Sequence, residues 1–216
     1  MTLDKDGFEM VPSGLSSACL GDLRHALSCL PFPAGKAGIR HVDQRLPQVL
    51  QLASNGALFD LAALNLGPSA RLVRAIYFDK SQGRNWLVTW HQDKTIVADR
   101  STVPGHWGPW SKKDGEWHVQ PPAEVLNQML TLRLHLDDAT AENGALKAIP
   151  GTHRQGVLPQ SRINEVASGM NATTCMACCG DVLLMKPLLL HASGKAVSDS
   201  PRRILHLEFG VYHFPG

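Results

Sequence analysis

The chain lacks the features that mark several large classes of protein. No apolar run is long enough to span a bilayer, and no cluster of Lys and Arg forms the footprint that nucleic-acid binding requires. The opening "MTLDKDGFEM" has no basic segment followed by an apolar one, so it is unlike a secretory signal. We therefore expect a cytoplasmic protein that acts on a small molecule, as a monomer or weak homodimer, with no nucleic-acid or membrane partner.

Charged residues are also scarce. Asp, Glu, Lys and Arg make up 19% of the 216 residues and nearly cancel, which leaves a formal net charge of +2. The apolar fraction of 44% is ordinary for a globular protein, and the sequence has no internal repeat, low-complexity segment or clear linker. This length fits one domain with a substantial core.

Cysteine is present in an odd number, five, and three of the five lie in "CMACCG". The pair Cys175 and Cys178 forms a CxxC, but a structural zinc site usually needs a second such pair or a pair of histidines. The remaining Cys19 and Cys29 are single residues in a predicted helix. We interpret all five, including Cys179, as small thiols, with metal or redox use as the alternative.

The first third of the chain predicts helices. In "SSACLGDLRHALSCL" a serine N-cap precedes leucine and alanine at three- to four-residue spacing. After the break "PFPAGKAG", a second helical stretch, "RLPQVLQLASNGALFDLAALNLG", is interrupted near residues 54–56 and ends at Gly67 and Pro68.

From about residue 70 the pattern changes to short β-branched and aromatic runs separated by turns. Such runs are typical of strands, and they include "ARLVRAIYF", "NWLVTWHQD", "GDVLLMKPLLLHAS" and "RRILHLEFGVYHF". "MLTLRLHLDD" alternates leucine with polar residues, which predicts a half-buried strand whose leucines face the core. Arg133 and His135, on its other face, are candidate pocket residues. Short strands with regular turns favour an antiparallel sandwich or barrel.

Residues 100–120 are rich in Gly, Pro and Trp and have no period, so they predict a long ordered loop. Loops of this length in a compact domain are commonly binding loops or lids. The side chains that make it a candidate lid are His106, Trp107, Trp110, Trp117 and His118. The alternative is that the tryptophans only pack the loop against the rest of the protein.

Two histidines and one aspartate suggest a metal site. His91 and Asp93 form an HxD at a strand end, and residues i and i+2 of a strand point the same way, about 7 Å apart along the chain. His191 ends a second predicted strand and could bring a third ligand. Two imidazoles and one carboxylate form the facial triad of non-haem Fe(II) oxygenases. An HxD alone is weak evidence, but its order with His191 and a following arginine is more specific.

From about Ala70 to its end, the chain resembles the phytanoyl-CoA dioxygenase family of Fe(II)/2-oxoglutarate oxygenases. The resemblance lies in "FDKSQGRNWLVTWHQD", "LTLRLHLDDATAENGALKAIPGTHRQGVL" and "GDVLLMKPLLLHASGKAVSDSPRRILHLEFG", and more faintly in "KDGFEMVPSGLSS". It implies a mainly β fold, a double-stranded β-helix or cupin-like jelly roll, flanked by helices. We expect a single domain over 1–216, with a mostly helical part at about 1–68 and the jelly-roll core at about 69–216.

The resemblance also implies residue roles. His91, Asp93 and His191 match the metal ligands and the catalytic centre. Arg202 matches the arginine that binds the distal carboxylate of 2-oxoglutarate, and its strand face also carries the polar His206 and Glu208.

The resemblance implies two further residues near the 2-oxoglutarate carboxylate, and a second arginine is an alternative to Arg202. Ser193 fits the small hydroxyl beside the co-substrate carboxylate, and Lys80 fits a lysine near 2-oxoglutarate. Arg203 is the competitor of Arg202, but it shares its strand face with Leu205 and Leu207.

The implied cofactors are Fe(II), 2-oxoglutarate as co-substrate and O2. The implied activity is that of a non-haem iron, 2-oxoglutarate-dependent dioxygenase, which oxidises and most commonly hydroxylates a small molecule while 2-oxoglutarate is decarboxylated to succinate. Halogenation is disfavoured, because the carboxylate of Asp93 takes the place that chloride would need. The alternatives are a cupin-like metal-binding protein or isomerase that does not use 2-oxoglutarate, and a non-catalytic protein that kept the fold.

Overall fold

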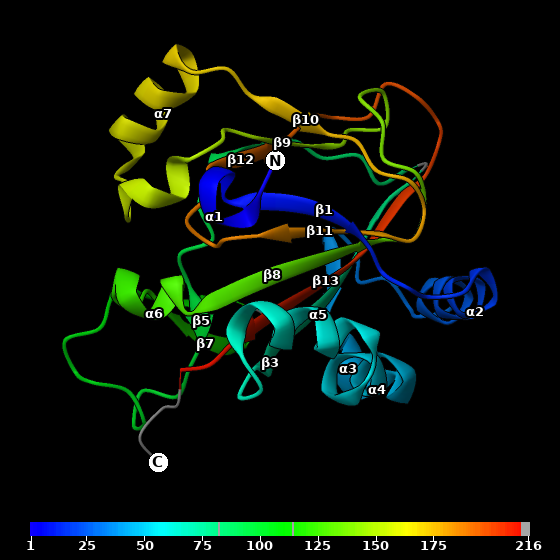
Figure 1. The fold of residues 1–216 in the computed structure, drawn as a ribbon, viewed down its shortest axis with the longest axis horizontal. Coiled ribbons are helices and arrows are strands. Elements are labelled where there is room, and N and C mark those ends of the chain that lie inside the picture. The colour runs from blue at the N-terminus through cyan, green and yellow to red at the C-terminus, as the bar shows by residue number, and fades with distance from the viewer. Residues whose placement is uncertain (82, 114, 213–216) are drawn as a thin grey trace.

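The structure is a computed structural model that describes residues 1–81, 83–113 and 115–212 (Figure 1). Two antiparallel sheets form its centre. The larger sheet has the order β1-β11-β8-β13-β3-β2. Its strands are β1 (Phe8–Pro12), β11 (Asp181–Met185), β8 (Met129–His135), β13 (Arg202–Gly210), β3 (Arg71–Lys80) and β2 (Gly38–Arg40).

The smaller sheet has the order β10-β9-β12-β4. Its strands are β10 (Thr173–Cys175), β9 (Leu146–Ala148), β12 (His191–Ser193) and β4 (Val88–His91). From β3 onward the chain passes repeatedly between the two sheets, since β3, β8, β11 and β13 belong to the larger one and β4, β9, β10 and β12 to the smaller. This winding is that of a double-stranded β-helix, and it confirms the predicted fold class.

Helices cover the outer face of the larger sheet (Figure 1). These helices are α2 (Ser17–Ser28), α3 (Val42–Arg45), α4 (Pro47–Asn55) and α5 (Ala57–Leu66). The Ser16 side chain caps α2, because its oxygen accepts a hydrogen bond from the Cys19 amide at 3.2 Å. The remaining helices are the short α1 (Leu3–Asp6) and α6 (Ala123–Asn127), the 3-10 helix η1 (Thr152–Gln155), and α7 (Gln160–Gly169), which packs beside β4.

The stretch Pro47–Leu66 has, by length and by a mean hydropathy of 1.2, the character of a membrane-crossing segment, contrary to the expectation from the sequence. Gly56 interrupts it with an extended backbone, φ −119° and ψ −171°, and so separates α4 from α5. Val49 and Leu58, one from each helix, are fully buried in the main core against the sheet. Each helix thus packs one face against the sheet and leaves its other side exposed.

β8 differs from its prediction as a half-buried strand, because every one of its residues is buried. Leu130, Leu132 and Leu134 join the main core under the helices, as expected. The opposite face is buried too, because it points into the space between the two sheets, where Arg133 pairs with His206 of β13. The alternation was correctly interpreted, but a polar face on an inner strand need not face solvent.

The region 100–120 is also more regular than the predicted loop. It contains β6 (Trp110–Lys113) and β7 (Glu116–Val119), which pair as a hairpin and form a small sheet with β5 (Ile96–Val97). Gly115, in the turn, has φ +90°, a backbone angle that favours glycine. The last predicted strand ends earlier than expected, at Gly210, and His213 and Phe214 of that prediction lie outside the described residues.

Candidate active site

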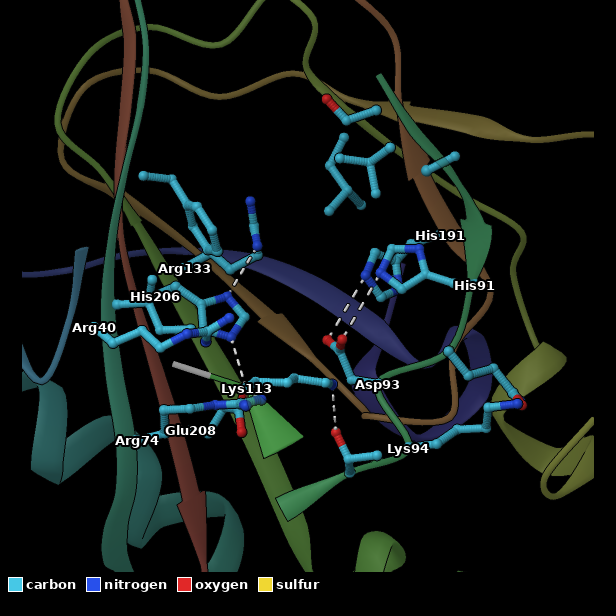
Figure 2. A pocket seen from close by; sticks show the side chains of 18 of the residues that line it. Arg40, Arg74, His91, Asp93, Lys94, Lys113, Arg133, His191, His206 and Glu208 are labelled. Carbon is cyan, nitrogen blue, oxygen red and sulfur yellow. Dashed lines mark hydrogen bonds and ion pairs between the residues drawn. The ribbon is translucent and has the colours of Figure 1, made fainter. Parts of the chain in front are cut away.

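Three side chains with metal-binding atoms meet where β4 ends and β12 begins. His91 is the last residue of β4, His191 is the first of β12, and the two stand opposite one another in the strand register. The Asp93 carboxylate lies 3.8 Å from His91 Nε2 and 3.7 Å from His191 Nε2. One ligand atom from each residue lies within 4.8 Å of the others. Figure 2 shows the carboxylate turned towards both rings, so the structure brings together the three residues that the sequence singled out.

The backbone fixes which nitrogen each ring presents to the others. His91 Nδ1 lies 2.8 Å from the Thr89 carbonyl oxygen, and His191 Nδ1 lies 3.0 Å from that of Leu189. A carbonyl oxygen can only accept, so each Nδ1 carries the hydrogen and donates it. In the neutral form of each ring, Nε2 then has its lone pair on the side of Asp93. This arrangement, with one ring nitrogen anchored and the other available, is typical of histidines that ligate a metal.

Gln92, between the two ligands of the HxD, points the other way and fixes the strand end. Its Nε2 donates to the carbonyls of Gly156 at 2.8 Å and Leu188 at 2.7 Å, and its Oε1 accepts from the Leu158 amide at 2.8 Å. The Asp93 amide adds a hydrogen bond to the Pro187 carbonyl at 2.9 Å. The connection between β11 and β12 thus holds the HxD in place, and Gln92 is a positioning residue that was not singled out from the sequence.

The charges of the triad suit a cation. Burial raises the pKa of the Asp93 carboxyl, but His191 and His91 lower it by more, so it stays well below its usual range. Burial lowers the pKa of His191 to about 4, so this imidazole is neutral at neutral pH. A metal binds the deprotonated carboxylate and the neutral imidazole, so both side chains are in the form that ligation requires. The donor set therefore fits a divalent transition-metal ion.

Lys80, Ser193 and Arg202 form a second cluster inside the barrel. Ser193 follows His191 by two residues and accepts hydrogen bonds from Lys80 Nζ at 3.1 Å and from Arg202 Nη2 at 3.3 Å. Its own hydroxyl donates to the Gly144 carbonyl at 2.8 Å. In the strand register Arg202 is directly opposite Lys80. All three side chains are buried, so the structure gathers the residues that the sequence placed around the co-substrate.

Two cations this close affect one another. Burial and then Arg202 and Arg133 lower the pKa of Lys80 to about 8, and burial and Arg133 lower the pKa of Arg202 to about 9. Both groups are still charged at neutral pH. A pair of buried cations is unfavourable unless an anion lies between them, so the cluster fits a carboxylate.

Arg203, the competitor of Arg202, faces the opposite way. Its Nε and Nη2 donate to the two carboxylate oxygens of Asp137 at 2.7 and 2.6 Å. Asp137 also lies 3.6 Å from Arg24 of helix α2. Arg203 therefore ties the sheet to the helical layer, and only Arg202 lines the pocket.

A cavity of about 440 Å3 is lined by the triad and by Ser193 and Arg202, and it continues beyond them. Lys80 contacts Ser193 but is not among the residues that line this cavity; it lines a separate, smaller pocket. Several of the residues that line the larger cavity and that the sequence did not identify are basic or aromatic. They are Arg40, Arg74, Trp86, Lys94 and Lys113. Arg133, a candidate from the sequence, does line the cavity, whereas His135 is buried with its Nδ1 3.2 Å from the Asp181 carbonyl and is not among the lining residues.

The tryptophans of residues 100–120 lie outside this cavity. Trp107 is buried against Tyr212, and Trp110 stacks edge-on with Trp117 beside the guanidinium of Arg100. His118 is fully buried and His106 does not line the cavity either. The hairpin reaches the cavity through Lys113 and Gln120 instead. The tryptophans therefore pack the hairpin against the rest of the protein, which was the alternative to a substrate lid.

Comparison with known families agrees with this geometry. The family model described as "Phytanoyl-CoA dioxygenase (PhyH)" matches residues 34–204, most of the chain. The chain belongs to the phytanoyl-CoA dioxygenase family. The resemblance found in the sequence is thus confirmed. The search of curated proteins found no match to this chain.

Solved structures with the same fold include several enzymes. EctD from S. alaskensis with bound Fe is 20% identical, with a TM-score of 0.73 over 99% of this chain and 77% of that one. HygX from Streptomyces hygroscopicus, with nickel and 2-oxoglutarate bound, is 18% identical, with a TM-score of 0.70 over 99% of this chain and 86% of that one. A further neighbour, at 18% identity and a TM-score of 0.69 over 96% of this chain and 78% of that one, is SnoN, an α-ketoglutarate-dependent epimerase from nogalamycin biosynthesis.

Proposed function

We propose that the protein is an Fe(II)/2-oxoglutarate-dependent dioxygenase that hydroxylates a small molecule. The observation that carries the proposal is the pairing of two clusters in one cavity, a triad that fits a metal and a buried cationic group that fits a carboxylate. Family membership and the iron and 2-oxoglutarate in neighbouring structures support it.

His91, Asp93 and His191 would hold the iron through Nε2, a carboxylate oxygen and Nε2. A triad on one side of a metal leaves the other coordination positions open for the co-substrate and O2. When bound there, iron supplies the activation of O2 that couples decarboxylation of 2-oxoglutarate to oxidation of the substrate.

The other residues bind and orient. Arg202 would bind the distal carboxylate of 2-oxoglutarate as a guanidinium fork, with Lys80 and Ser193 beside it. The buried wall between the two sheets excludes water from this end of the cavity, which strengthens these charge interactions. The Thr89 and Leu189 carbonyls keep both imidazoles in the ligating tautomer.

The cupin-like or isomerase alternative would use the metal without 2-oxoglutarate. It leaves Lys80 and Arg202 as two buried cations without an anion, which is a costly arrangement with no purpose. We therefore favour the 2-oxoglutarate-dependent reaction. Hydroxylation is the outcome that we propose, since Asp93 takes the place of a chloride and the epimerase SnoN shows only that this fold also serves other outcomes. We further propose that the whole chain acts as one domain, as a cytoplasmic monomer or weak homodimer.

Consumption of 2-oxoglutarate tests the function. In air, the protein with Fe(II) and 2-oxoglutarate should form succinate slowly even without a substrate, through uncoupled decarboxylation. A molecule that the enzyme hydroxylates should raise the rate of succinate formation, with equal amounts of succinate and hydroxylated product. Succinate formation that is identical in the Asp93→Ala variant would contradict the proposal. A substrate transformed without consumption of 2-oxoglutarate would favour the isomerase.

A further inference from the structure

A second cationic cluster lines the same cavity, at the other end from Arg202. Arg74 of β3, Lys113 of β6 and Arg40 of β2 all line the cavity. Figure 2 shows Arg40 and Arg74 on the side away from the triad of His91, Asp93 and His191, and Lys113 extending between them and Asp93. They come from three strands far apart in the sequence, so the fold rather than a local motif gathers them.

The co-substrate cannot account for this cluster. Along the paired β3 and β13, the rung of Lys80 and Arg202 is six residues from the rung of Arg74 and Glu208. Six residues of strand cover roughly 20 Å, whereas the five-carbon chain of 2-oxoglutarate is no longer than about two residues of strand. A molecule held at Arg202 therefore does not reach Arg74, and the second cluster is left for another ligand.

The cluster has donors that nothing in the described part of the chain satisfies. Arg74 forms an ion pair with Glu208, yet its Nε is buried without a hydrogen-bond partner. Lys113 donates to the neutral Thr95 hydroxyl at 3.2 Å. Deeper in the cavity, Arg133 bonds His206 through Nη1, and its Nε is likewise buried without a partner. The unpartnered Nε groups of Arg74 and Arg133 are buried and cost free energy that an anionic ligand would recover, whereas Lys113 is an exposed residue that lines the same cavity.

The charge balance points the same way. Among the described lining residues the only carboxylates are Asp93, which belongs to the triad, and Glu208, which already accepts from Arg74 and His206. Burial and then the nearby Arg74 and Arg40 lower the pKa of Lys113, so the cations repel one another in the free protein. Lys94 lies at the same mouth, but its ammonium bonds the Leu158 carbonyl at 3.2 Å. Among the described lining residues, Arg74, Lys94 and Lys113 thus outnumber Glu208, the one carboxylate outside the triad.

We propose that the substrate carries a compact anionic group, a phosphate or a carboxylate, which binds between Arg74 and Lys113 while the rest of the molecule extends towards the triad. The proposal rests on the proposed function for the meaning of substrate, but the anion site itself does not. A guanidinium and an ammonium from opposite walls suit such a group, because each donates charge-assisted hydrogen bonds to a different oxygen. The site therefore selects anionic over neutral molecules.

The test is binding of inorganic phosphate, and separately of acetate, to protein loaded with Ni(II) and 2-oxoglutarate. Isothermal calorimetry at low and high salt would give the dissociation constants. Lys113→Gln should weaken binding roughly tenfold, the usual effect of losing one charge-assisted hydrogen bond. Lys112→Gln is the matched control, since Lys112 has the same charge on the same strand but lies against the Trp117 ring on the other face. It should leave the constant unchanged within about twofold.

Each outcome decides the proposal. Binding of either anion that Lys113→Gln weakens and Lys112→Gln does not supports it, and the stronger of the two anions identifies the group. Three results would overturn the proposal. They are anion binding that both variants weaken equally, anion binding that occurs only when 2-oxoglutarate is left out, and no anion binding at all. Protein that fails to retain Ni(II) and 2-oxoglutarate but binds phosphate through Lys113 would leave the anion site standing and contradict the proposed function instead.

Discussion

His91 and His191 face one another across the β4–β12 pair, with ring centroids 4.2 Å apart and an angle of 51° between the rings. Two imidazoles this close, each anchored through Nδ1, present both Nε2 atoms to the same carboxylate. Neutral rings tolerate this arrangement, whereas two imidazolium ions would repel. The pair is therefore built for a cation between the rings and Asp93, and the predictions below follow from that geometry.

Replacement of the carboxylate should abolish the metal site. Asp93→Ala removes the one charged ligand, so iron affinity should fall by more than the roughly 10- to 100-fold that loss of an outer-shell partner costs. Metal content after dialysis against a defined free Fe(II) concentration measures the effect. Asp99→Ala, which removes an exposed carboxylate from the loop after β5, is the control and should keep the metal. Equal metal content in both variants would show that Asp93 is not a ligand.

The adjacent arginines should have different effects, because they point to opposite faces of β13. Arg202→Gln should weaken 2-oxoglutarate binding by about 2 to 5 kcal/mol, since it removes the charged partner of a buried carboxylate. Arg203→Gln should leave that affinity unchanged and lower the free energy of unfolding by about 1 to 3 kcal/mol, since it breaks the pair with Asp137. Calorimetry and urea unfolding measure the two quantities. The opposite pattern would make Arg203 the co-substrate residue.

Lys80 should make 2-oxoglutarate binding depend on pH. Its pKa of about 8 in the free protein means that it is charged below pH 8 and loses its charge as the pH rises. Affinity should therefore be highest below pH 8 and fall above it, by at most about tenfold per pH unit for one proton. Arg202, whose pKa burial and Arg133 lower to about 9, is still mostly charged near pH 8, where Lys80 loses its proton. Lys80→Met should flatten the profile between pH 7 and 9, whereas Lys147→Met, at an exposed position of β9, should preserve it.

Gly144 should tolerate no side chain. Its φ is +78°, and a Cβ there would lie 2.7 Å from the Gly194 carbonyl oxygen and 3.2 Å from Lys80 Nζ. Gly144→Ala should lower the free energy of unfolding by about 1 to 3 kcal/mol. It should also weaken 2-oxoglutarate binding, because it would displace Lys80, which donates a hydrogen bond to the Gly194 carbonyl at 2.7 Å. Gly169→Ala meets nothing within 4 Å and serves as the control. Stability unchanged in both variants would show that the loop at Gly144 is free to move.

Much of the site could be predicted from local pattern. The spacing of two residues put His91 and Asp93 on one side of the chain, and alternation along the last strand separated the face of Arg202 from that of Arg203. The same alternation, followed back from Lys80 along β3, reaches Phe78, Ile76 and Arg74 and would have found Arg74 as a lining residue. Patterns of period two work here because a strand has only two faces.

What the sequence left out depends on how distant strands meet. Arg40 and Lys113 reach the cavity only because β2 pairs with β3 and the β6–β7 hairpin borders the same cavity, and no local signal specifies that arrangement. The buried polar face of β8 was missed for a similar reason, since a second sheet covers it. The hairpin itself did leave a signal, the Asp-Gly pair at 114–115, which the many Gly, Pro and Trp residues around it obscured.

The most direct test of the central claim is anaerobic titration of the protein with Fe(II) and then 2-oxoglutarate. If iron sits at His91, Asp93 and His191 and 2-oxoglutarate chelates it with its far carboxylate on Arg202, a visible metal-to-ligand charge-transfer band should appear and saturate at one equivalent of each. The band should be absent in Asp93→Ala and should need more 2-oxoglutarate in Arg202→Gln. Folded protein that retains Fe(II) but shows no band at saturating 2-oxoglutarate would contradict the claim.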